Sequence, residues 1–373
     1  MKKIENLNKH NYRNLIKTFI NLVKIESPSL KEKKIINYLK NELKNLGLEL
    51  YFQKVGETGN LVAKLKGKKN NSFFLNAHID TVEPCYGVKP IITDTLIKSD
   101  GKTILGGDDK AALAIFIELI KFIKKHNIPT PDIYFVLTYG EEIGLVGAKN
   151  FDFSLLKAKY GFSFDADGSP GTIILSAPTH YLYEIKVYGK SAHAGIEPEK
   201  GLNAIKIAAD IINNIPMGKI DFETTANVGK IEGGIATNIV PDFVQFNGEV
   251  RSRNKIKLKN YIKNLKELLN EKSRKYKTKI EYNFNLAYKG YKFNENSFLV
   301  KKLKEACEIC NLPVKYVHSN GGSDANIFNQ NGFPTLNLGI GMQNVHSKNE
   351  FILIKDLINS FRLAVSIVNV LSS

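Results

Sequence analysis

Short apolar runs in the first half of the chain end in histidine or acidic residues, and helical patterns separate them. The runs are "SFFLNAHI", "DIYFVLTY" and "KYGFSF", which lead into "DTV", "GEEIG" and "DADG". Between the first two lies "KAALAIFIELIKFIKK", whose apolar residues recur at helical spacing. Buried strands that alternate with helices predict an α/β fold with a central sheet, in which ligands bind beyond the carboxyl ends of the strands.

The pattern changes near residue 179. "YLYEIKVYGKS" alternates apolar and polar residues, as a half-exposed antiparallel strand does. The order expected up to residue 289 is β-α-β-β-α-β, which is the ferredoxin-like arrangement, and the first pattern then returns. We therefore predict a larger α/β domain formed by residues 1–178 and 290–373, with a smaller α+β domain, residues 179–289, inserted into it.

Two helices are expected at the N-terminal end, near residues 10–24 and 30–46. The sequence "SLKE", from Ser29 to Glu32, has the form of a capping box for the second helix. The first residues, "MKKIENLNKHNYRNLIK", are basic but contain no continuous apolar core. We expect a mature N-terminus there, not a secretory signal.

Charge and composition exclude several function classes. The net charge of +16 is compatible with nucleic-acid binding, but the lysines are spread along the chain on the polar faces of amphipathic helices. We therefore expect no nucleic-acid partner, and attraction of small anionic ligands remains open. No apolar run approaches the roughly 18 residues of a spanning helix, so no membrane segment is expected.

The cysteine content indicates the compartment. The three cysteines, an odd and small number, suit a reducing environment, and we predict a cytoplasmic protein. Cys307 and Cys310 have the C-x-x-C form but end a helical pattern. Helix packing is therefore favoured for them over a redox or zinc role.

His78 and Asp80 stand two residues apart at the end of an apolar run. Alternate side chains of a strand point to the same side, so both could face one cavity. An ordinary strand end with a solvated aspartate gives the same pattern. This stretch alone does not separate the two interpretations.

Five motifs carry the candidate chemistry: "HID", "GGDDK", "GEE", "DAD" and "NVHS". Together they supply two histidines and several carboxylates at one presumed edge of the sheet. Carboxylates held so close repel one another, which raises their pKa values. Bound divalent cations remove this conflict, and imidazole with carboxylate ligands suits zinc, manganese or cobalt.

The segments "HIDTV", "LGGDDKAAL", "GEEIGLVGAK", "GKSAHAG" and "NVHS", in this order, resemble the M20 metallopeptidases, and among them the peptidase T-like enzymes. The resemblance covers nearly the whole chain. It implies a di-metal catalytic domain of the phosphorylase/hydrolase type and an inserted lid with a ferredoxin-like sheet, through which a homodimer would form. One departure is that Ala112 stands where many relatives have glycine, and we expect a slight repacking there.

The resemblance also implies ligands for two divalent ions, with zinc favoured and cobalt or manganese as alternatives. His78 corresponds to a ligand of the first ion, and Asp108 to a carboxylate that bridges the two ions. Glu142 and His346 correspond to ligands of the second ion.

The last ligand of the first ion remains open between two aspartates. Asp165 directly follows the apolar run, as the acidic ligand does in the family, and Asp167 would match with a gap. We favour Asp165. The family pattern also implies a cis peptide bond between Asp108 and Asp109, which is rare outside X–Pro bonds.

The remaining catalytic roles follow from the same resemblance. Asp80 would hydrogen-bond His78 through its carboxylate and fix its tautomer. Glu141 would be the general base, taking a proton from the attacking water and delivering it to the leaving amine. His193 of "SAHAG" would donate to the developing oxyanion, in many relatives within the active site of a partner subunit, although a structural histidine in a glycine-rich turn explains the motif as well.

Substrate-binding residues are marked less clearly. Asn238 in "ATNIVPD" and Arg251 in "GEVRSR" resemble residues that contact the substrate, and Arg253 is close enough to be confused with Arg251. Gly322 and Ser323 in "SNGGSDAN" resemble part of a glycine-rich loop that closes the substrate pocket. A tight turn before a helix accounts for the same residues.

These assignments predict a metal-dependent exopeptidase, with an aminopeptidase for short peptides favoured. An amidase or deacylase of N-acyl amino acids is the alternative, because the same site cuts any amide placed over it. A non-catalytic binding protein on the same fold is a further alternative, against which Glu141 argues because such a protein needs no base.

Overall fold

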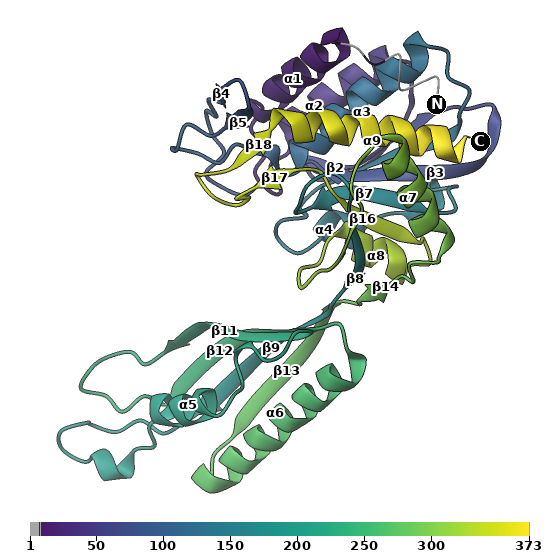
Figure 1. Cartoon of the computed structure of the whole chain (residues 1–373). Coiled ribbons are helices and arrows are strands. Elements are labelled where there is room, and N and C mark those ends of the chain that lie inside the picture. The colour runs from purple at the N-terminus through teal and green to yellow at the C-terminus, as the bar shows by residue number, and fades with distance from the viewer. Residues whose placement is uncertain (1–6, 8, 373) are drawn as a thin grey trace. The chain divides into compact units, whose positions relative to one another are not determined.

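The computed structural model describes residue 7 and residues 9–372, which form two compact units (Figure 1). The first unit contains the chain up to Leu175, Lys292–His318 and the residues from Ser323 onward, and the second contains Ser176–Tyr291 with Ser319–Gly322. The domain limits 178/179 and 289/290 stay a prediction. The interpretation of the first residues as a mature N-terminus falls largely outside the described residues.

The first unit contains helices from both ends of the chain. They are α1 (Lys9–Val23), α2 (Lys33–Asn45), α3 (Gly107–Lys125), α4 (Val146–Lys149), the 3₁₀ helix η1 (Phe153–Leu155), α7 (Phe298–Ile309), α8 (Asp324–Gln330) and α9 (Ile354–Leu371). The strands are β1 (Glu49–Val55), β2 (Thr58–Leu65), β3 (Lys69–His78), β4 (Ile91–Ile92), β5 (Leu96–Lys98), β6 (Pro131–Thr138), β7 (Gly161–Ala166), β15 (Lys315–His318), β16 (Thr335–Gly339), β17 (Met342–Gln343) and β18 (Phe351–Leu353), with β8 (Thr172–Ala177) and β14 (Tyr291–Lys292) at the boundary.

The main sheet has the strand order β1-β2-β6-β3-β7-β16-β8-β14, and β15 pairs with β8. Its central strands β6, β3, β7 and β16 are parallel to one another, whereas β1, β2 and β8 pair antiparallel. The carboxyl ends of the four central strands therefore lie at one edge. A smaller sheet has the order β17-β18-β5-β4.

Alternate residues of the central strands pack into two separate cores. Phe73 and Leu75 of β3 belong to the core that α1, α2, α3, α7 and α9 complete. Phe74 points to the opposite face, where its ring lies 4.9 Å from that of Phe328 in α8. Figure 1 shows α1, α2, α3 and α9 on one side of the sheet and α8 on the other. Packing on both faces holds the ends of the central strands in place.

The second unit is an antiparallel sheet with two helices on one face. Its elements are β9 (Thr179–Tyr188), η2 (Pro198–Lys200), α5 (Ala204–Asn213), β10 (Gly218–Lys219), β11 (Thr224–Gly233), β12 (Phe243–Ser252), α6 (Lys255–Tyr276) and β13 (Ile280–Tyr288). The strand order is β10-β11-β12-β9-β13, and Ile185 of β9 packs with residues of both helices. This is the predicted ferredoxin-like order, with the short β10 added at one edge.

The predicted capping box at Ser29 and Glu32 is wrong. The N-terminus of α2 has no side-chain cap. Instead, Ser29 Oγ donates to Asp80 Oδ2 over 2.6 Å, and Glu32 Oε1 accepts the main-chain N–H of Gly140 over 3.1 Å. Both side chains thus contact segments at the carboxyl edge of the sheet, far away in sequence.

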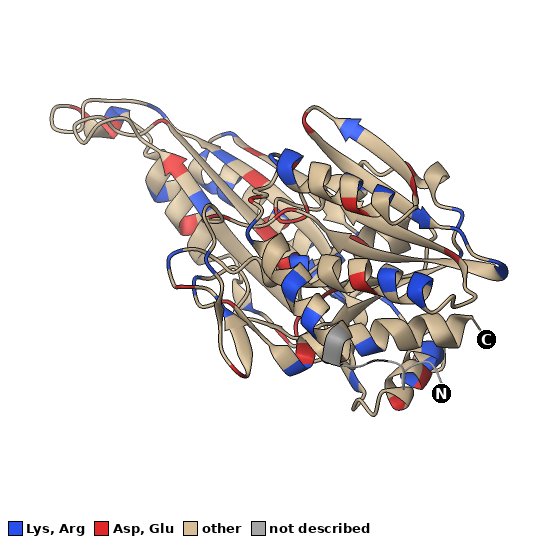
Figure 2. Ribbon diagram, turned by 90° about the horizontal axis from the view of Figure 1, so that it is seen from above, with Lys and Arg blue, Asp and Glu red and all other residues tan. Residues whose placement is uncertain are grey.

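The basic residues are spread along the chain, as expected from the sequence. Figure 2 shows Lys and Arg on helices and strands throughout the chain, interspersed with Asp and Glu. Within the described residues, no helix combines the length and the apolar character needed to cross a membrane. Cys85, Cys307 and Cys310 are buried free thiols.

Candidate metal centre

Histidine and carboxylate side chains meet at the carboxyl edge of the parallel strands. His78 is the last residue of β3 and is in register with Thr138, the last residue of β6. Glu141 and Glu142 follow β6 in a turn, and Asp165 is the penultimate residue of β7. Because these strands end side by side, residues that are distant in sequence lie together in one site.

Asp108 lies between two histidines. His78 Nε2 is 2.9 Å from its Oδ1, and His346 Nε2 is 3.2 Å from its Oδ2. A carboxylate whose two oxygens face two different nitrogen ligands has the arrangement of a bridging ligand. The expected cis peptide bond between Asp108 and Asp109 is present, at the non-helical start of α3.

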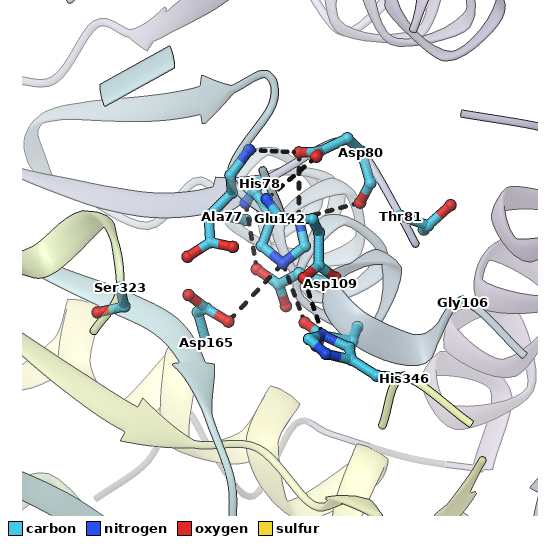
Figure 3. Close-up of polar contacts among 12 residues, drawn as sticks. Ala77, His78, Asp80, Thr81, Gly106, Asp109, Glu142, Asp165, Ser323 and His346 are labelled. Atoms are coloured by element: carbon cyan, nitrogen blue, oxygen red, sulfur yellow. Dashed lines mark hydrogen bonds and ion pairs between the residues drawn. The ribbon is translucent and has the colours of Figure 1, made fainter. Parts of the chain in front are cut away.

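Glu142 lies on the His346 side of this carboxylate. Its Oε2 is 2.8 Å from His346 Nε2, whereas its Oε1 is buried and has no hydrogen-bond partner. One ligand atom from each of His78, Asp108 and Glu142 lies within 4.8 Å of the others. Figure 3 shows His78, Glu142, Asp165 and His346 around one space.

A second group of ligand atoms lies on the His78 side. His78, Asp109 and Asp165 again bring their atoms within 4.8 Å of one another, with 3.8 Å between His78 Nε2 and Asp165 Oδ1. Asp109 Oδ2 accepts the main-chain N–H of His78 over 3.3 Å, and its buried Oδ1 has no partner. Asp167 is exposed. The geometry favours Asp165 over Asp167, although the ligand role itself stays a prediction.

Most acidic groups of the centre are unfavourably placed as charged groups, whereas hydrogen bonds with His346 and His78 lower the pKa of Asp108 against the effect of burial. Burial, with neighbouring carboxylates, raises the pKa of Asp109, Glu142 and Asp165 above the usual range of such groups. Burial likewise raises the pKa of Glu141, to which the charge of Asp165 contributes. A cluster of this kind gains stability when positive charge enters it.

The negative charge of the carboxylates also acts on the two histidines. Burial tends to lower the pKa of His78, but its hydrogen bond with Asp108 and the surrounding carboxylates raise that pKa well above the usual value. Hydrogen bonds with Asp108 and Glu142 raise the pKa of His346 to about 10. A field that stabilises imidazolium also stabilises a metal cation.

These residues fit divalent cations. Imidazole nitrogens and carboxylate oxygens are the donors that zinc and similar metals take in proteins. Two buried oxygens, Glu142 Oε1 and Asp109 Oδ1, have no hydrogen-bond partner, and each belongs to one of the two ligand groups. Buried polar atoms of this kind are rarely left unsatisfied, so the cluster is a candidate metal centre.

Asp80 faces His78 with two of its oxygen atoms. His78 Nδ1 is 2.9 Å from the main-chain oxygen of Asp80 and 3.5 Å from Oδ1 of its carboxylate. That carboxylate accepts the main-chain N–H groups of Glu141, over 2.9 Å, and Glu142, over 3.2 Å. Asp80 therefore contacts His78 through its carbonyl group and its carboxylate, and the carboxylate also holds the turn with both glutamates.

Three supporting residues were missed by the sequence analysis. Besides Glu32, Glu350 accepts main-chain N–H groups from the loop before α3 and from Asp108 at the non-helical start of α3. Asn337 Oδ1 accepts the N–H of Asp165 over 3.1 Å, and its Nδ2 donates to the carbonyl of Asp165 over 2.9 Å. Glu350 could have been suspected from its position, because it stands only four residues after the predicted ligand His346.

In the second unit, His193 and Asn238 lie close together. The N–H of Ala194 donates to the carbonyl of Asn238 over 2.9 Å. The His193 ring is exposed, and its Nδ1 accepts the main-chain N–H groups of Gly195 and Ile196, each over 3.2 Å. Since Nδ1 is an acceptor, the ring proton of neutral His193 lies on Nε2.

The two arginines of β12 and its end have different partners. Arg251 forms a bidentate pair with Glu249, with distances of 3.0 and 2.9 Å, and His180 Nε2 lies 3.0 Å from the same carboxylate. Arg253 donates to the carbonyl of Ser319 over 3.1 Å. A substrate role for Arg251 stays a prediction. In this structure its guanidinium group is paired with Glu249.

The glycine-rich loop has packing roles of its own. A Cβ on Gly322 would lie 2.3 Å from the ring of Tyr288, so only glycine fits there. Ser323 is the N-cap residue of α8, and its Oγ accepts a hydrogen bond from Asn337 over 3.1 Å. These packing and capping contacts account for a glycine at position 322 and a serine at position 323 without any substrate. They do not test the predicted substrate role of the two residues.

Three segments match known families of peptidases. Residues 181–277 match the peptidase dimerisation domain of the M20 family. Residues 60–212 match peptidase family M28, and residues 270–363 match M42 glutamyl aminopeptidase.

Relatives cover nearly the whole chain. The protein YqjE of Bacillus subtilis is 39% identical over 96% of this chain and 98% of its own length. The crystal structure of aminopeptidase PepT from Bacillus cereus is 39% identical, with a TM-score of 0.89 over 97% of this chain and 99% of that one. A tripeptidase structure from Staphylococcus aureus is 37% identical, with a TM-score of 0.93 over 97% and 98%.

The fold and the site thus define a peptidase of the metal-dependent class. The chain belongs to the M20 peptidase family and, within it, to the peptidase T-like proteins.

Proposed function

We propose that the chain is a metal-dependent aminopeptidase that removes the N-terminal residue from short peptides. The observation that carries this proposal is the Asp108 carboxylate held between His78 and His346. Relatives of similar length are named aminopeptidase and tripeptidase, which supports the same substrate class.

The centre would hold two divalent ions, and we favour zinc because of its mixed imidazole and carboxylate donors. His78 and Asp165 would hold one ion, Glu142 and His346 the other, and Asp108 would bridge them. Such ions polarise the scissile carbonyl and lower the pKa of water to about 7.

Glu141 is the proposed general base. Its carboxylate takes the proton from the attacking water and then delivers it to the nitrogen of the leaving amine. Burial, with the charge of Asp165, raises the pKa of Glu141 in the metal-free centre. The hydrogen bond from the Glu141 N–H to the Asp80 carboxylate fixes the position of the Glu141 main chain.

His193 is the proposed donor to the developing oxyanion. Its Nδ1 is engaged by two main-chain N–H groups, so Nε2 presents its proton to solvent and to a substrate. We propose Asn238, Arg251 and the loop with Gly322 and Ser323 as substrate contacts. A homodimer through the second unit and a cytoplasmic location complete the proposal, supported by the dimerisation-domain match and the free thiols.

The test compares Glu141→Gln with the wild-type chain. The variant should retain its metal while kcat falls by about 10²–10⁴-fold, the contribution of a positioned general base. Glu57→Gln, which alters an exposed glutamate paired with Lys33, serves as the control and should leave kcat unchanged. Undiminished turnover in Glu141→Gln would contradict the proposed base.

Substrate class is tested separately. Free tripeptides and N-acetylated amino acids are offered to the same enzyme with zinc, manganese or cobalt present. Release of free N-terminal residues from the tripeptides is expected. Hydrolysis of the acylated compounds alone would make the chain a deacylase.

A further inference from the structure

We propose that Glu350 is a positioning residue that fixes the loop bearing Asp108 and thereby sets the affinity of the centre for metal. Resting on the proposed function, this inference deepens it. Glu350 lies just before β18, with only 1% of its surface exposed. It faces the main chain of the loop before α3, and none of its described contacts is with a proposed ligand side chain.

Both carboxylate oxygens of Glu350 accept hydrogen bonds from the main chain of one short segment, residues 105–108. Oε2 accepts the N–H groups of Leu105 and Gly106, each over 2.8 Å, and Oε1 accepts the N–H of Asp108 over 3.1 Å. The last of these bonds ends on the residue whose carboxylate faces both histidines. A shift of the Glu350 carboxylate therefore moves the Asp108 main chain directly.

The same segment also carries His346. The N–H of Glu350 donates to the carbonyl of Ser347 over 3.2 Å, and its own carbonyl accepts the N–H of Ser99 over 3.0 Å. Glu350 thus links the turn with His346 to the loop with Asp108. Their 3.2 Å contact depends on two segments that are far apart in sequence, and Glu350 bonds to both.

Only a carboxylate satisfies this arrangement. Three N–H donors converge on two acceptor oxygens, whereas the amide of glutamine offers one oxygen and one NH₂ donor. In Glu350→Gln, one side of the group would therefore place a donor against a donor. The backbone must move to relieve this contact, and Asp108 moves with it.

The experiment measures metal binding by the full-length chain, independently of peptidase activity. Chelator-treated wild-type and Glu350→Gln chains are titrated with Zn²⁺ by calorimetry. Loss of a residue that supports metal ligands typically weakens affinity by about 10–100-fold, and we expect a loss of this size. Glu118→Gln is the matched control, because Glu118 is also a buried glutamate, bonded to Thr18 over 2.7 Å, and it should bind as the wild type does.

A second readout separates positioning from general stability. Amide hydrogen exchange at Leu105, Gly106 and Asp108 in the metal-free chain should accelerate in Glu350→Gln and not in Glu118→Gln. Turnover of Glu350→Gln should rise towards the wild-type value as Zn²⁺ is increased, with KM unchanged.

A milder variant acts on the same contact if Glu350→Gln does not fold. A Cβ on Gly107 would lie 3.1 Å from Glu350 Oε1, so Gly107→Ala displaces the carboxylate while keeping its charge. It should weaken Zn²⁺ binding by several-fold. Wild-type affinity in a folded Glu350→Gln chain, or in Gly107→Ala when that chain is the one tested, overturns the inference. If the wild-type chain itself binds no metal, the proposed function fails instead.

Discussion

Asp80 Oδ1 accepts the main-chain N–H of Glu141 over 2.9 Å, and Oδ2 accepts that of Glu142 over 3.2 Å. One buried carboxylate therefore holds both the proposed base and a proposed metal ligand. In Asp80→Asn, an NH₂ group would face one of these N–H groups. We expect kcat to fall by about 10–100-fold or more, measured by steady-state kinetics with a tripeptide.

The matched control is Ser29→Ala. Ser29 donates to Asp80 Oδ2 over 2.6 Å, and its removal leaves both main-chain bonds in place. We expect a loss of a few-fold at most, by the same assay. If Asp80→Asn were no worse than Ser29→Ala, the carboxylate would not be what orders the turn.

Replacing Glu32 by glutamine should destabilise the fold less than replacing it by alanine, and the glutamine variant should gain on the wild type as pH rises. In Glu32→Gln the side-chain carbonyl can still accept the N–H of Gly140, which Glu32→Ala leaves unsatisfied. Burial raises the pKa of Glu32 above its ordinary 4.5. A carboxyl pKa raised by folding means that stability is fully present below the ordinary value and is lost as pH rises through the raised one. Glu32→Gln should therefore gain on the wild type as pH rises above 4.5.

Denaturant unfolding at several pH values checks the Glu32 prediction. Glu32→Ala should cost about 1–3 kcal/mol, and Glu32→Gln clearly less. A difference between wild type and Glu32→Gln that stays constant across this range would show that Glu32 keeps its ordinary pKa in the fold.

Metal should raise the thermal stability of the chain. Buried carboxylates with raised pKa values occupy the centre, and a cation relieves their repulsion. Metal at 100 times its Kd stabilises a folded protein by about 2.7 kcal/mol. A thermal melt after chelation, repeated with added Zn²⁺, measures this shift. His346→Ala should show a smaller shift, and an equal shift would place the bound metal elsewhere.

His193→Ala should lower kcat more than it raises KM. A donor to an oxyanion acts mainly in the transition state, and its loss costs about 10²–10³-fold. Steady-state kinetics with tripeptides measures both constants. His126→Ala, at the C-cap of α3, is the control. Unchanged kcat in His193→Ala would leave His193 as a structural residue of its turn.

Glu249 should stabilise the second unit in a pH-dependent way. Its hydrogen bond with His180 and its bidentate pair with Arg251 lower its pKa from 4.5 to about 2, against the effect of burial. A lowered carboxyl pKa means that the stabilisation is present above pH 4.5 and is lost as pH falls towards 2. Glu249→Gln should cost about 1–3 kcal/mol at pH 7 and progressively less in acid.

Calorimetry between pH 7 and pH 3 tests the Glu249 prediction. Glu232→Gln is the control, because Glu232 pairs with Lys230 on an exposed part of β11 and should have little effect at any pH. A loss in Glu249→Gln that is independent of pH would argue for packing as its cause.

The strand ends were predictable because they depend on local pattern. Apolar runs of strand length ended at His78, before Glu141 and at Asp165, and parallel strands bring their carboxyl ends together whatever the details of packing. The ferredoxin-like order of the second unit was readable for the same reason. The resemblance then supplied the roles that spacing alone left open.

The supporting contacts were not predictable in this way. Ser29 and Glu32 fitted a local capping pattern, but their partners are Asp80 and Gly140, which only the folded sheet brings near. The resemblance implied a bond from the Asp80 carboxylate to His78, but not that the same carboxylate accepts the N–H groups of Glu141 and Glu142. The turn after β6 competes for that carboxylate, and its N–H groups are invisible in the sequence.

The strand order also determines when, during synthesis of the chain, the candidate metal centre can assemble. β16, residues 335–339, lies between β7 and β8 in the finished sheet, and His346 follows it by a few residues. A nascent chain emerging from the ribosome has an open seam at that place until β16 has been made. Synthesis itself thus delays assembly of a hydrolytic centre that would otherwise form beside unfinished polypeptide.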